Sequence, residues 1–355
     1  MYKQLLPLLL LTLFSGWAMA IQPEKRTHLF AVKGSDSLYL DHYIAPIEGK
    51  RPCMIFVFGG GFVGGARDKK SDIPYFQFLT KNGYDVVSID YRLGLRGIKS
   101  PGLIDFLKAF QRTINIAVED LFSATRYILD HAEEWNIDPT MITASGSSAG
   151  AITVLQAENN LCNRTEIAKI LPKRFNYAGI ISFAGAIFSL KGAPQWSAPS
   201  APIMLFHGSA DNQVPYGKMA VLGIGFYGSK YIAQELENQQ NPYWFYTVEY
   251  EDHSMAGKPM RENLQEILIF LNEYVKDKKQ LMQTTRIIDK SIPQRRTFFL
   301  PTDYIQSNYS DKTIIYKYKE PVIIIIIITG SLYFVFPKGL FIFLLYPIET
   351  LSILF

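Results

Sequence analysis

The stretch Gly146-Ser147-Ser148-Ala149-Gly150 decides how this chain is interpreted. It fits the pattern G-x-S-x-G, in which a serine sits on a sharp turn between a strand and a helix. The neighbouring sequence agrees, because residues 141–144 form a short β-type run and residues 149–158 have the composition of a helix. Glycine on each side of such a turn lets other backbone pass close to it. The stretch therefore predicts Ser148 as a nucleophile, and the two neighbouring serines fall outside the glycine frame.

Around this turn, apolar runs of strand length alternate with segments of helical spacing. The strand-length runs are residues 54–58, 84–91, 141–144, 177–183, 203–206 and 244–250. The helical segments are residues 117–132, 149–158, 218–238 and 260–275. This alternation predicts an α/β fold with a mostly parallel central sheet and helices on both faces, and with sites beyond the carboxyl ends of the strands. Residues 29–33 and 37–44 instead predict an antiparallel N-terminal hairpin.

A serine hydroxyl needs a base to accept its proton, and the chain has five histidines. His253 lies in the polar loop after the last β-type run, where this architecture keeps its site. We therefore expect His253 to be the base. The other four have plainer places in the early hairpin, at a helix end and at a strand end: His28, His42, His131 and His207. For His207 we expect a structural hydrogen-bonding role.

The base needs an acid that holds its tautomer and stabilises the imidazolium. Asp211 lies in the loop after the apolar run 203–206. It gives the chain order Ser148, Asp211, His253, which is the order of this fold. Asp252, directly beside the base, is the alternative acid, although sequence neighbours rarely face one another productively.

Three consecutive glycines follow the apolar run 54–58 and leave their backbone amides bare. Together with the amide of Ala149, at the start of the helix after the nucleophile, the amides of these three glycines are the expected donors to an oxyanion. This chemistry requires neither a metal nor another cofactor. The two cysteines, Cys53 and Cys162, have no metal-ligand spacing, and they either pair or remain two buried thiols.

Taken together, these motifs resemble the carboxylesterase and lipase branch of the α/β-hydrolases, over about residues 29–275. Within that branch the chain resembles the hormone-sensitive-lipase-like and the bacterial feruloyl- or acetyl-esterase-like members. The motifs that carry the resemblance are Phe58-Gly59-Gly60-Gly61-Phe62, Asp90-Tyr91-Arg92, Asn136-Ile137-Asp138-Pro139, Gly146-Ser147-Ser148-Ala149-Gly150, His207-Gly208-x-x-Asp211-x-x-Val214-Pro215 and His253.

The resemblance implies that Ser148 is acylated, that His253 acts first as base and then as acid, and that Asp211 orients it. Gly60, Gly61 and Ala149 would supply the oxyanion amides. The chain departs from the family at Phe58, where a histidine usually precedes the glycines, and this departure bears on the geometry of the loop and on acyl preference.

The implied function is a serine carboxylesterase that hydrolyses short-chain acyl or carbohydrate-linked esters through an acyl-enzyme. The alternatives are a serine peptidase of the same fold and a non-catalytic binding protein of that fold. Residues 93–102 and 184–201 are candidate rim loops, and Trp196 is a candidate surface for stacking on substrate.

The two ends of the chain differ from its body. Residues 1–20 have a basic start, an apolar run and a small-residue cleavage pattern, as in an export signal, and the run of roughly 15 apolar residues is short for a membrane span, which needs about 20. We expect the protein to be periplasmic or secreted. The catalytic domain is assigned to residues 21–279, and a polar linker or disordered segment to residues 280–321. Residues 322–355 form a hydrophobic tail, either a membrane segment or an unselected extension.

The charge of the chain argues against nucleic acid as a partner. The formal net charge is +4, but residues from 274 onward hold 11 of the basic and 6 of the acidic side chains. The rest of the chain holds 25 basic and 26 acidic side chains and is close to neutral. A nucleic-acid-binding body would instead carry a basic patch. The expected partner is a small-molecule or carbohydrate ester, with membrane association only through the tail.

Overall fold

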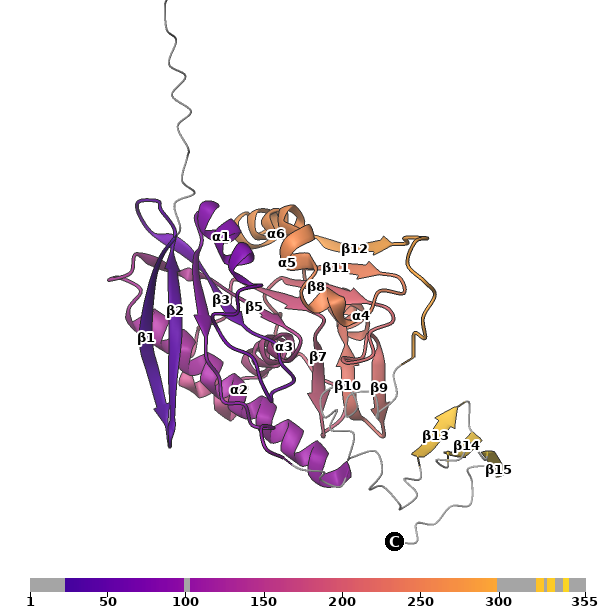
Figure 1. Ribbon diagram of the computed structural model, residues 1–355. Helices are drawn as coiled ribbons and strands as arrows, with labels where there is room; N and C mark the ends of the chain where they lie inside the picture. Colours follow the sequence, from indigo (N-terminus) through magenta and orange to yellow (C-terminus); the bar gives the residue numbers. More distant parts are fainter. Residues whose placement is uncertain (1–22, 99–102, 299–323, 329–330, 336–340, 345–355) are drawn as a thin grey trace, which may run out of the picture.

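The computed structural model describes residues 23–98 and 103–298, together with three short backbone strands at 324–328, 331–335 and 341–344. The main body is built on a nine-stranded sheet of order β1-β2-β4-β3-β5-β6-β8-β11-β12 (Figure 1). Its strands are β1 (Glu24–Lys33), β2 (Asp36–Ile44), β3 (Arg51–Val57), β4 (Asp85–Ile89), β5 (Ile137–Ser147), β6 (Gly179–Phe183), β8 (Ile203–Gly208), β11 (Tyr243–Val248) and β12 (Met282–Ile287).

The strands from β4 to β12 in this order run parallel, and only the β1–β2 hairpin and its junction with β4 are antiparallel. The central strands are apolar on both faces and almost wholly buried, as parallel strands covered on each side must be. Neighbouring strands end at the same level, with Val57 opposite Gly146 and Gly208 opposite Val248. The loops that follow these strands therefore emerge along one edge of the sheet.

Helices cover both faces of the sheet. On one side lie α1 (Ile73–Lys81), α5 (Pro259–Glu262) and α6 (Leu264–Phe270), and on the other the long α2 (Leu103–Asp130) crosses α3 (Ala149–Cys162), as Figure 1 shows. A further α-helix, α4 (Ser229–Asn238), packs on β8 and β11. The expected α/β architecture with an N-terminal hairpin is confirmed.

The segment 218–238, predicted to be one helix, is a helix only in its second half. Its first half forms the strands β9 (Lys218–Val221) and β10 (Ile224–Gly228), which join β7 (Ala186–Ser189) in a small antiparallel sheet. Gly223 and Gly225 both have positive φ, at 83° and 146°, and a helix does not admit such residues. The prediction of one helix from the apolar spacing is therefore wrong, because Gly223 and Gly225 interrupt that spacing.

The polar segment predicted to be a linker from residue 280 begins with a strand. Residues of β12 pair in parallel with β11, from Met282 opposite Tyr243 to Ile287 opposite Val248. The prediction was wrong here because an edge strand needs few buried side chains, and β12 is largely exposed.

The chain ends fall largely outside the described residues. The predicted export signal, residues 1–20, lies wholly outside them, as does most of residues 299–355. The tail contributes the backbone strands β13 (Ile324–Ile328), β14 (Ser331–Val335) and β15 (Phe341–Leu344), paired antiparallel. Among the helices in the described part of the chain, none combines the length and the apolar character needed to cross a bilayer.

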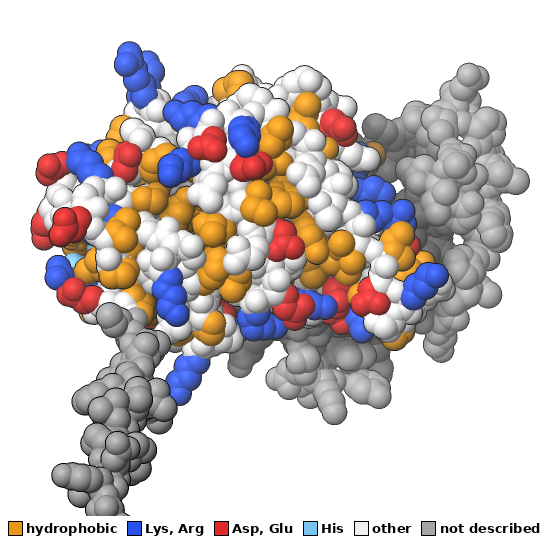
Figure 2. All heavy atoms as spheres, turned by 90° about the horizontal axis from the view of Figure 1, so that it is seen from above, with side chains coloured by type: hydrophobic (Ala, Val, Ile, Leu, Met, Phe, Trp, Pro, Cys, Tyr) orange, Lys and Arg blue, Asp and Glu red, His pale blue; other side chains and the backbone are white. Residues whose placement is uncertain are grey.

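Both cysteines are free thiols inside the body. Cys53 lies in β3 and Cys162 at the end of α3. Burial raises the pKa of each thiol, so neither is poised to react. On the face of the molecule seen in Figure 2, basic and acidic side chains are interspersed, with no single-sign patch.

Candidate active site

The nucleophile candidate sits on a strained turn between strand and helix. Ser148 follows the last residue of β5, precedes the first residue of α3, and has φ 52° and ψ −115°. A residue other than glycine rarely adopts a positive φ, so the surrounding structure must hold Ser148 in this conformation. Its backbone is held on both sides, since its N–H donates to Phe183 O at 2.9 Å and its carbonyl accepts from Ile152 N at 2.9 Å.

The glycines around this turn are sterically required. A Cβ on Gly146 would lie 2.3 Å from the carbonyl oxygen of Gly150. A Cβ on Gly150 would lie 2.0 Å from the carbonyl oxygen of Val57, at the end of β3. Real Cβ atoms do not come so close to backbone, so only glycine allows the turn to pack between β3 and its own helix. The spacing of G-x-S-x-G therefore follows from the packing of backbone on backbone.

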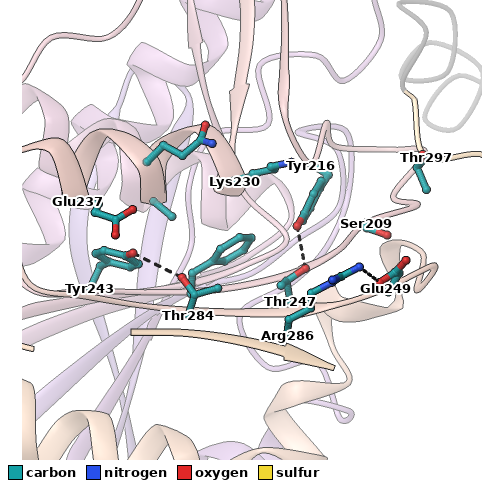
Figure 3. Close-up of a pocket in the computed structure, with 13 residues that line it drawn as sticks. Ser209, Tyr216, Lys230, Glu237, Tyr243, Thr247, Glu249, Thr284, Arg286 and Thr297 are labelled. Carbon is teal, nitrogen blue, oxygen red and sulfur yellow. Dashed lines mark hydrogen bonds and ion pairs between the residues drawn. The ribbon is translucent and has the colours of Figure 1, made fainter. Parts of the chain in front are cut away.

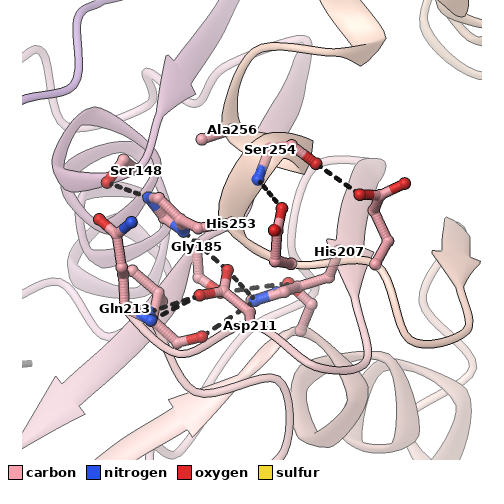
Figure 4. Close-up of polar contacts among 12 residues, drawn as sticks. Ser148, Gly185, His207, Asp211, Gln213, His253, Ser254 and Ala256 are labelled. Atoms are coloured by element: carbon pink, nitrogen blue, oxygen red, sulfur yellow. Dashed lines mark hydrogen bonds and ion pairs between the residues drawn. The ribbon is translucent and has the colours of Figure 1, made fainter. Parts of the chain in front are cut away.

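The structure brings the three predicted triad side chains together, as Figure 4 shows. The Nε2 atom of His253 lies 2.8 Å from Ser148 Oγ. Its Nδ1 atom lies 2.7 Å from Asp211 Oδ2. The loops after β8 and β11 carry the acid and the base, so the three groups meet at the edge where the parallel strands end. Base, orienting acid and hydroxyl stand at hydrogen-bond distance in the order that proton transfer needs.

The alternative acid, Asp252, is used elsewhere. Its carboxylate accepts from the N–H of Ser254 at 2.9 Å and so caps the short turn that carries His253. Its other oxygen pairs with Arg295. Asp252 thus shapes the loop of the base, and Asp211 contacts the imidazole itself.

The histidines near the N-terminal hairpin lie in another part of the molecule. His28 and His42 both contact Trp135, with ring centroids 4.8 and 4.6 Å away, His28 tilted and His42 stacked. The Nε2 atom of His42 also lies 2.8 Å from Asp85 Oδ2. His131 stacks on Tyr127 rather than standing free in solvent.

The carboxylate of Asp211 is fully buried and remains ionised. Burial alone would raise the pKa of this carboxyl, but the charge of His253 and the hydrogen bonds from His207 and His253 outweigh it and hold the pKa well below its usual range. Two backbone N–H groups, from Gln213 and Val214, also donate to Oδ1 at 2.8 and 2.9 Å. The acid is therefore a fixed negative charge beneath the imidazole.

The predicted oxyanion glycines lie on a tight loop directly beside the nucleophile. A Cβ on Gly59 would stand 3.1 Å from the Cβ of Ser148, so the loop touches the turn. Gly60 and Gly61 have φ of 141° and 62°, and the carbonyl of Gly60 accepts from Val63 and Gly64 at 3.0 Å. Within residues 23–98 and 103–298, the amides of Gly60 and Gly61 donate to no backbone acceptor. The amide of Ala149 begins α3 and has no partner in the helix by geometry.

Phe58 orders the glycine loop by packing. Its buried ring lies 4.5 Å from the ring of Tyr91, whose hydroxyl donates to the Phe58 carbonyl at 2.9 Å. The ring also lies so close to Gly65 that a Cβ there would meet it at 2.5 Å. Tyr91 belongs to the Asp90-Tyr91-Arg92 motif, and Arg92 is itself anchored to Asp120. An aromatic pair thus holds the loop where the family resemblance led us to expect a histidine.

Of the two predicted rim loops, one borders the glycine loop. Leu95 N donates to Phe62 O at 3.2 Å, and Arg96 Nε donates to Val63 O at 3.2 Å. Residues 99–102 of this rim lie outside the described residues.

Trp196 lies far from the nucleophile. Its neighbours Gln195 and Ser197 are bonded to Asn163, just past the C-terminal end of α3, with Gln195 O accepting from Asn163 Nδ2 at 2.7 Å. Ser148 is at the opposite end of that helix, about 20 Å away at 1.5 Å per residue. Trp196 is half-buried against the core, and a substrate bound at Ser148 would not reach it unless it were very long.

A hollow of about 580 Å³ opens elsewhere on the body, between α4 and the strands β11 and β12 (Figure 3). Polar pairs line it, such as Glu249 with Arg286 and Thr247 with Tyr216. None of the triad side chains lines it. Its lining offers no nucleophile held by a base, so we assign the chemistry to the triad edge of the sheet.

Sequence reasoning missed one contact that joins the parts of the site. Ser147 Oγ donates to Ala256 O at 2.7 Å, and Ala256 ends the turn that begins with His253. The residue before the nucleophile therefore fastens the loop of the base to the elbow. The two residues are 109 positions apart, so no local pattern could have revealed this bond.

Comparison with known sequences agrees with this geometry. The family model described as BD-FAE matches residues 40–187, which contain the glycine loop and the nucleophile turn. Fumonisin B1 esterase of Sphingopyxis macrogoltabida is 32% identical over 120 residues, covering 33% of this chain and 22% of that protein. Gut esterase 1 of Caenorhabditis briggsae is 34% identical over 125 residues, covering 35% and 21%. The chain thus spans about a fifth of the length of these relatives.

Comparison with solved structures covers more of the molecule. Esterase 2 of Thermogutta terrifontis, in its apo form, matches with a TM-score of 0.52 and 21% identity, over 73% of this chain and 97% of that one. The propionate-bound form of the same enzyme matches with a TM-score of 0.52 over 74% and 97%. The fold is shared across nearly the whole of that enzyme.

Proposed function

We propose that the chain is a serine esterase of the carboxylesterase branch of the α/β-hydrolases, in which Ser148, His253 and Asp211 form the catalytic triad. The observation that carries the proposal is the imidazole of His253, which lies within 2.8 Å of the serine oxygen and 2.7 Å of the buried carboxylate. A binding protein has no need of an ionised acid held beneath such a base.

In the proposed mechanism, His253 Nε2 accepts the proton of Ser148 as its oxygen attacks the ester carbonyl. Asp211 stabilises the imidazolium that forms. The negative charge that develops on the carbonyl oxygen is met by the amides of Gly60, Gly61 and Ala149, and losing one such donor costs about 3 kcal/mol of transition-state stabilisation. The imidazolium then gives its proton to the departing alcohol and leaves an acyl-serine.

The second half of the reaction repeats these steps with water. A water molecule attacks the acyl-serine while His253 takes a proton from it. His253 then returns that proton to Ser148 as the carboxylic acid product leaves. No metal or other cofactor enters either half. Because the base must be uncharged to accept a proton, activity is expected to be lost at acid pH.

For the substrate we propose short acyl groups, on small alcohols or on carbohydrates. The tight glycine loop, packed on Phe58 and bordered by residues 93–98, favours a small acyl group at the nucleophile. Solved structures of the Thermogutta terrifontis enzyme are described as propionate-bound and butyrate-bound, so a similar fold holds short carboxylates. The carbohydrate alcohol rests on the family resemblance alone.

The decisive experiment compares the purified chain with its Ser148→Ala variant on p-nitrophenyl acetate, with circular dichroism as the check on folding. We expect turnover by the parent and none above background by the variant. A fluorophosphonate probe should label the parent and spare the variant. Equal turnover by the two proteins would refute the assignment.

Two alternatives from the same fold make different predictions. A serine peptidase would cleave a peptide p-nitroanilide faster than the aryl ester. A non-catalytic binding protein would be labelled by no fluorophosphonate. An ester panel that varies acyl length against a fixed alcohol, and then alcohol against a fixed acyl group, would define the substrate.

We also propose that the protein is exported, on the basis of the basic, apolar and small-residue pattern of residues 1–20. Fractionation of cells expressing the full chain should place the esterase outside the cytoplasm. N-terminal sequencing of that protein should begin near residue 21. A chain that keeps its first residues inside the cell would refute the export signal.

A further inference from the structure

The carboxylate of Asp211 is met by a donor at each of its lone pairs. Oδ1 accepts from the N–H of Gln213 at 2.8 Å and of Val214 at 2.9 Å. Oδ2 is shared between two histidines, with His253 Nδ1 at 2.7 Å and His207 Nε2 at 3.2 Å. An ionised carboxylate has about four acceptor sites, so His207 supplies the fourth contact.

The surroundings of His207 fix where its proton lies. The ring is fully buried at the end of β8, and Nε2 lies 3.2 Å from both Asp211 Oδ2 and Val214 O. Both neighbours are acceptors, so Nε2 must carry hydrogen. The opposite nitrogen, Nδ1, lies 2.7 Å from the hydroxyl of Ser229, and that hydroxyl lies 3.1 Å from Gly185 O.

We propose that His207 is a positioning residue of the triad, which acts through Asp211 by sharing the oxygen that faces His253. The proposal rests on the proposed esterase function. A second donor on Oδ2 withdraws part of its negative charge from His253 and fixes the direction in which the carboxylate points. His207, on the buried side of Asp211, then affects both the basicity of His253 and the orientation of its ring.

The other titratable groups near this chain of contacts are already paired or uncharged. Tyr216 meets the His207 ring edge-on, with centroids 5.7 Å apart, and its hydroxyl accepts from Thr247. In the loop of the base, Glu251 pairs with Lys258, and Asp252 pairs with Arg295. Because these pairs do not involve His207, a change at that residue leaves them in place.

Two substitutions of similar size test the two ring nitrogens of His207 one at a time. In His207→Gln the amide nitrogen reaches the place of Nε2 and can still donate to Asp211. In His207→Asn the shorter amide reaches only the place of Nδ1, so it keeps a polar group near Ser229 and loses the bond to the acid. Circular dichroism and thermal unfolding verify the fold, and fluorophosphonate titration counts active sites.

We expect His207→Asn to lower kcat/KM for p-nitrophenyl acetate by about 10- to 100-fold, the range of a hydrogen bond to a charged group. The midpoint of the acid limb of the pH profile should rise by about 0.5 to 1 pH unit, because an unshared carboxylate stabilises the imidazolium more strongly. His207→Gln should keep kcat/KM within about threefold, with the midpoint unmoved. A residue that only fills space would lower the number of active sites without moving the midpoint.

The proposal is overturned if His207→Asn keeps the parent midpoint, or if His207→Gln is impaired as much as His207→Asn. Should His207→Asn fail to fold, Ser229→Ala gives the second measurement. It releases Nδ1, so the midpoint should move upward by a smaller amount, and an unmoved midpoint overturns the proposal.

The low-field proton NMR signal of the His253–Asp211 hydrogen bond separates this proposal from the function itself. It should shift in His207→Asn and stay in place in His207→Gln, whether or not the ester is hydrolysed. An inactive parent chain that shows this shift refutes the esterase and retains the positioning role. An active parent without the shift does the reverse.

Discussion

The two halves of the site are built by different means. The nucleophile turn and the glycine loop fit together through backbone packed on backbone, so that a single added Cβ at Gly150 would lie 2.0 Å from Val57 O. The acid and the base stand on loops held by hydrogen bonds and ion pairs, such as Asp252 to Ser254 N and Glu251 to Lys258. The first half leaves no room for a Cβ at Gly60, Gly146 or Gly150, whereas the second half is held by charges and hydrogen bonds.

An added side-chain atom in the nucleophile turn is expected to lower both the stability and the activity of the protein strongly. Gly150→Ala should lose about 3 kcal/mol or more of unfolding free energy, because backbone must move to accept the Cβ. No activity should remain. Urea unfolding and the p-nitrophenyl acetate assay measure both effects.

The matched control for that change is Gly64→Ala, in the neighbouring glycine loop, where a Cβ would have nothing within 4 Å. It should change the unfolding free energy by less than about 1 kcal/mol. Equal losses in the two variants would show that loop flexibility, rather than close packing, requires the glycines.

Substitutions among the acid and base residues should lower catalytic activity while the protein stays folded. Asp211→Asn is expected to lower kcat about 10⁴-fold, because the amide no longer stabilises the imidazolium and favours the wrong tautomer. Asp252→Asn, next to the same histidine, should change kcat by less than about fivefold, as exposed ion pairs contribute little. Comparable losses in both would mean that the acid was misassigned.

The bond that joins the halves should have a moderate effect. Ser147→Ala removes the donor to Ala256 O, 2.7 Å away, and frees the loop of the base from the elbow. A net hydrogen bond of this kind corresponds to about a 2- to 10-fold fall in kcat/KM. Ser123→Ala, which removes a 2.8 Å bond to Glu119 O in α2, is the control and should leave kcat/KM unchanged.

The smallest effect is expected behind the site, in α3, and concerns stability alone. Glu158 is fully buried, and burial raises the pKa of its carboxyl. The folded state therefore binds a proton that the unfolded chain releases, so the contribution of Glu158 to stability is present at acid pH and falls as the pH rises above the unfolded value. Glu158→Gln mimics the protonated form, and its advantage over the parent in urea unfolding should grow with pH. A difference independent of pH would contradict this.

The sequence could predict the features that depend on short-range patterns. The elbow was predictable because Gly146 and Gly150 pack against nearby backbone, and their spacing records that packing. The order of the triad followed from loops after strands, and the structure places Ser148, Asp211 and His253 within hydrogen-bond distance. The parallel sheet followed from apolar strand runs.

Other features depend on contacts that no local pattern records. The role of His207 requires knowing that Oδ2 of Asp211 has two imidazole neighbours, and the Ser147–Ala256 bond joins residues 109 positions apart. The β9–β10 hairpin was missed because apolar spacing alone does not distinguish a helix from strands joined at glycines. Trp196 was suggested by residue type, which says nothing of its position at the far end of α3.

Chemical modification of the two buried thiols can measure local opening of the structure around each of them. Cys53 lies in the strand that leads to the glycine loop, and Cys162 lies at the end of α3 remote from the nucleophile. A thiol reagent added in brief pulses would modify each only when its own surroundings open, and mass spectrometry of the peptides would separate the two rates. Because Cys53 lies in a central strand and Cys162 at the end of α3, the same experiment would report whether the sheet or that end of the helix opens first.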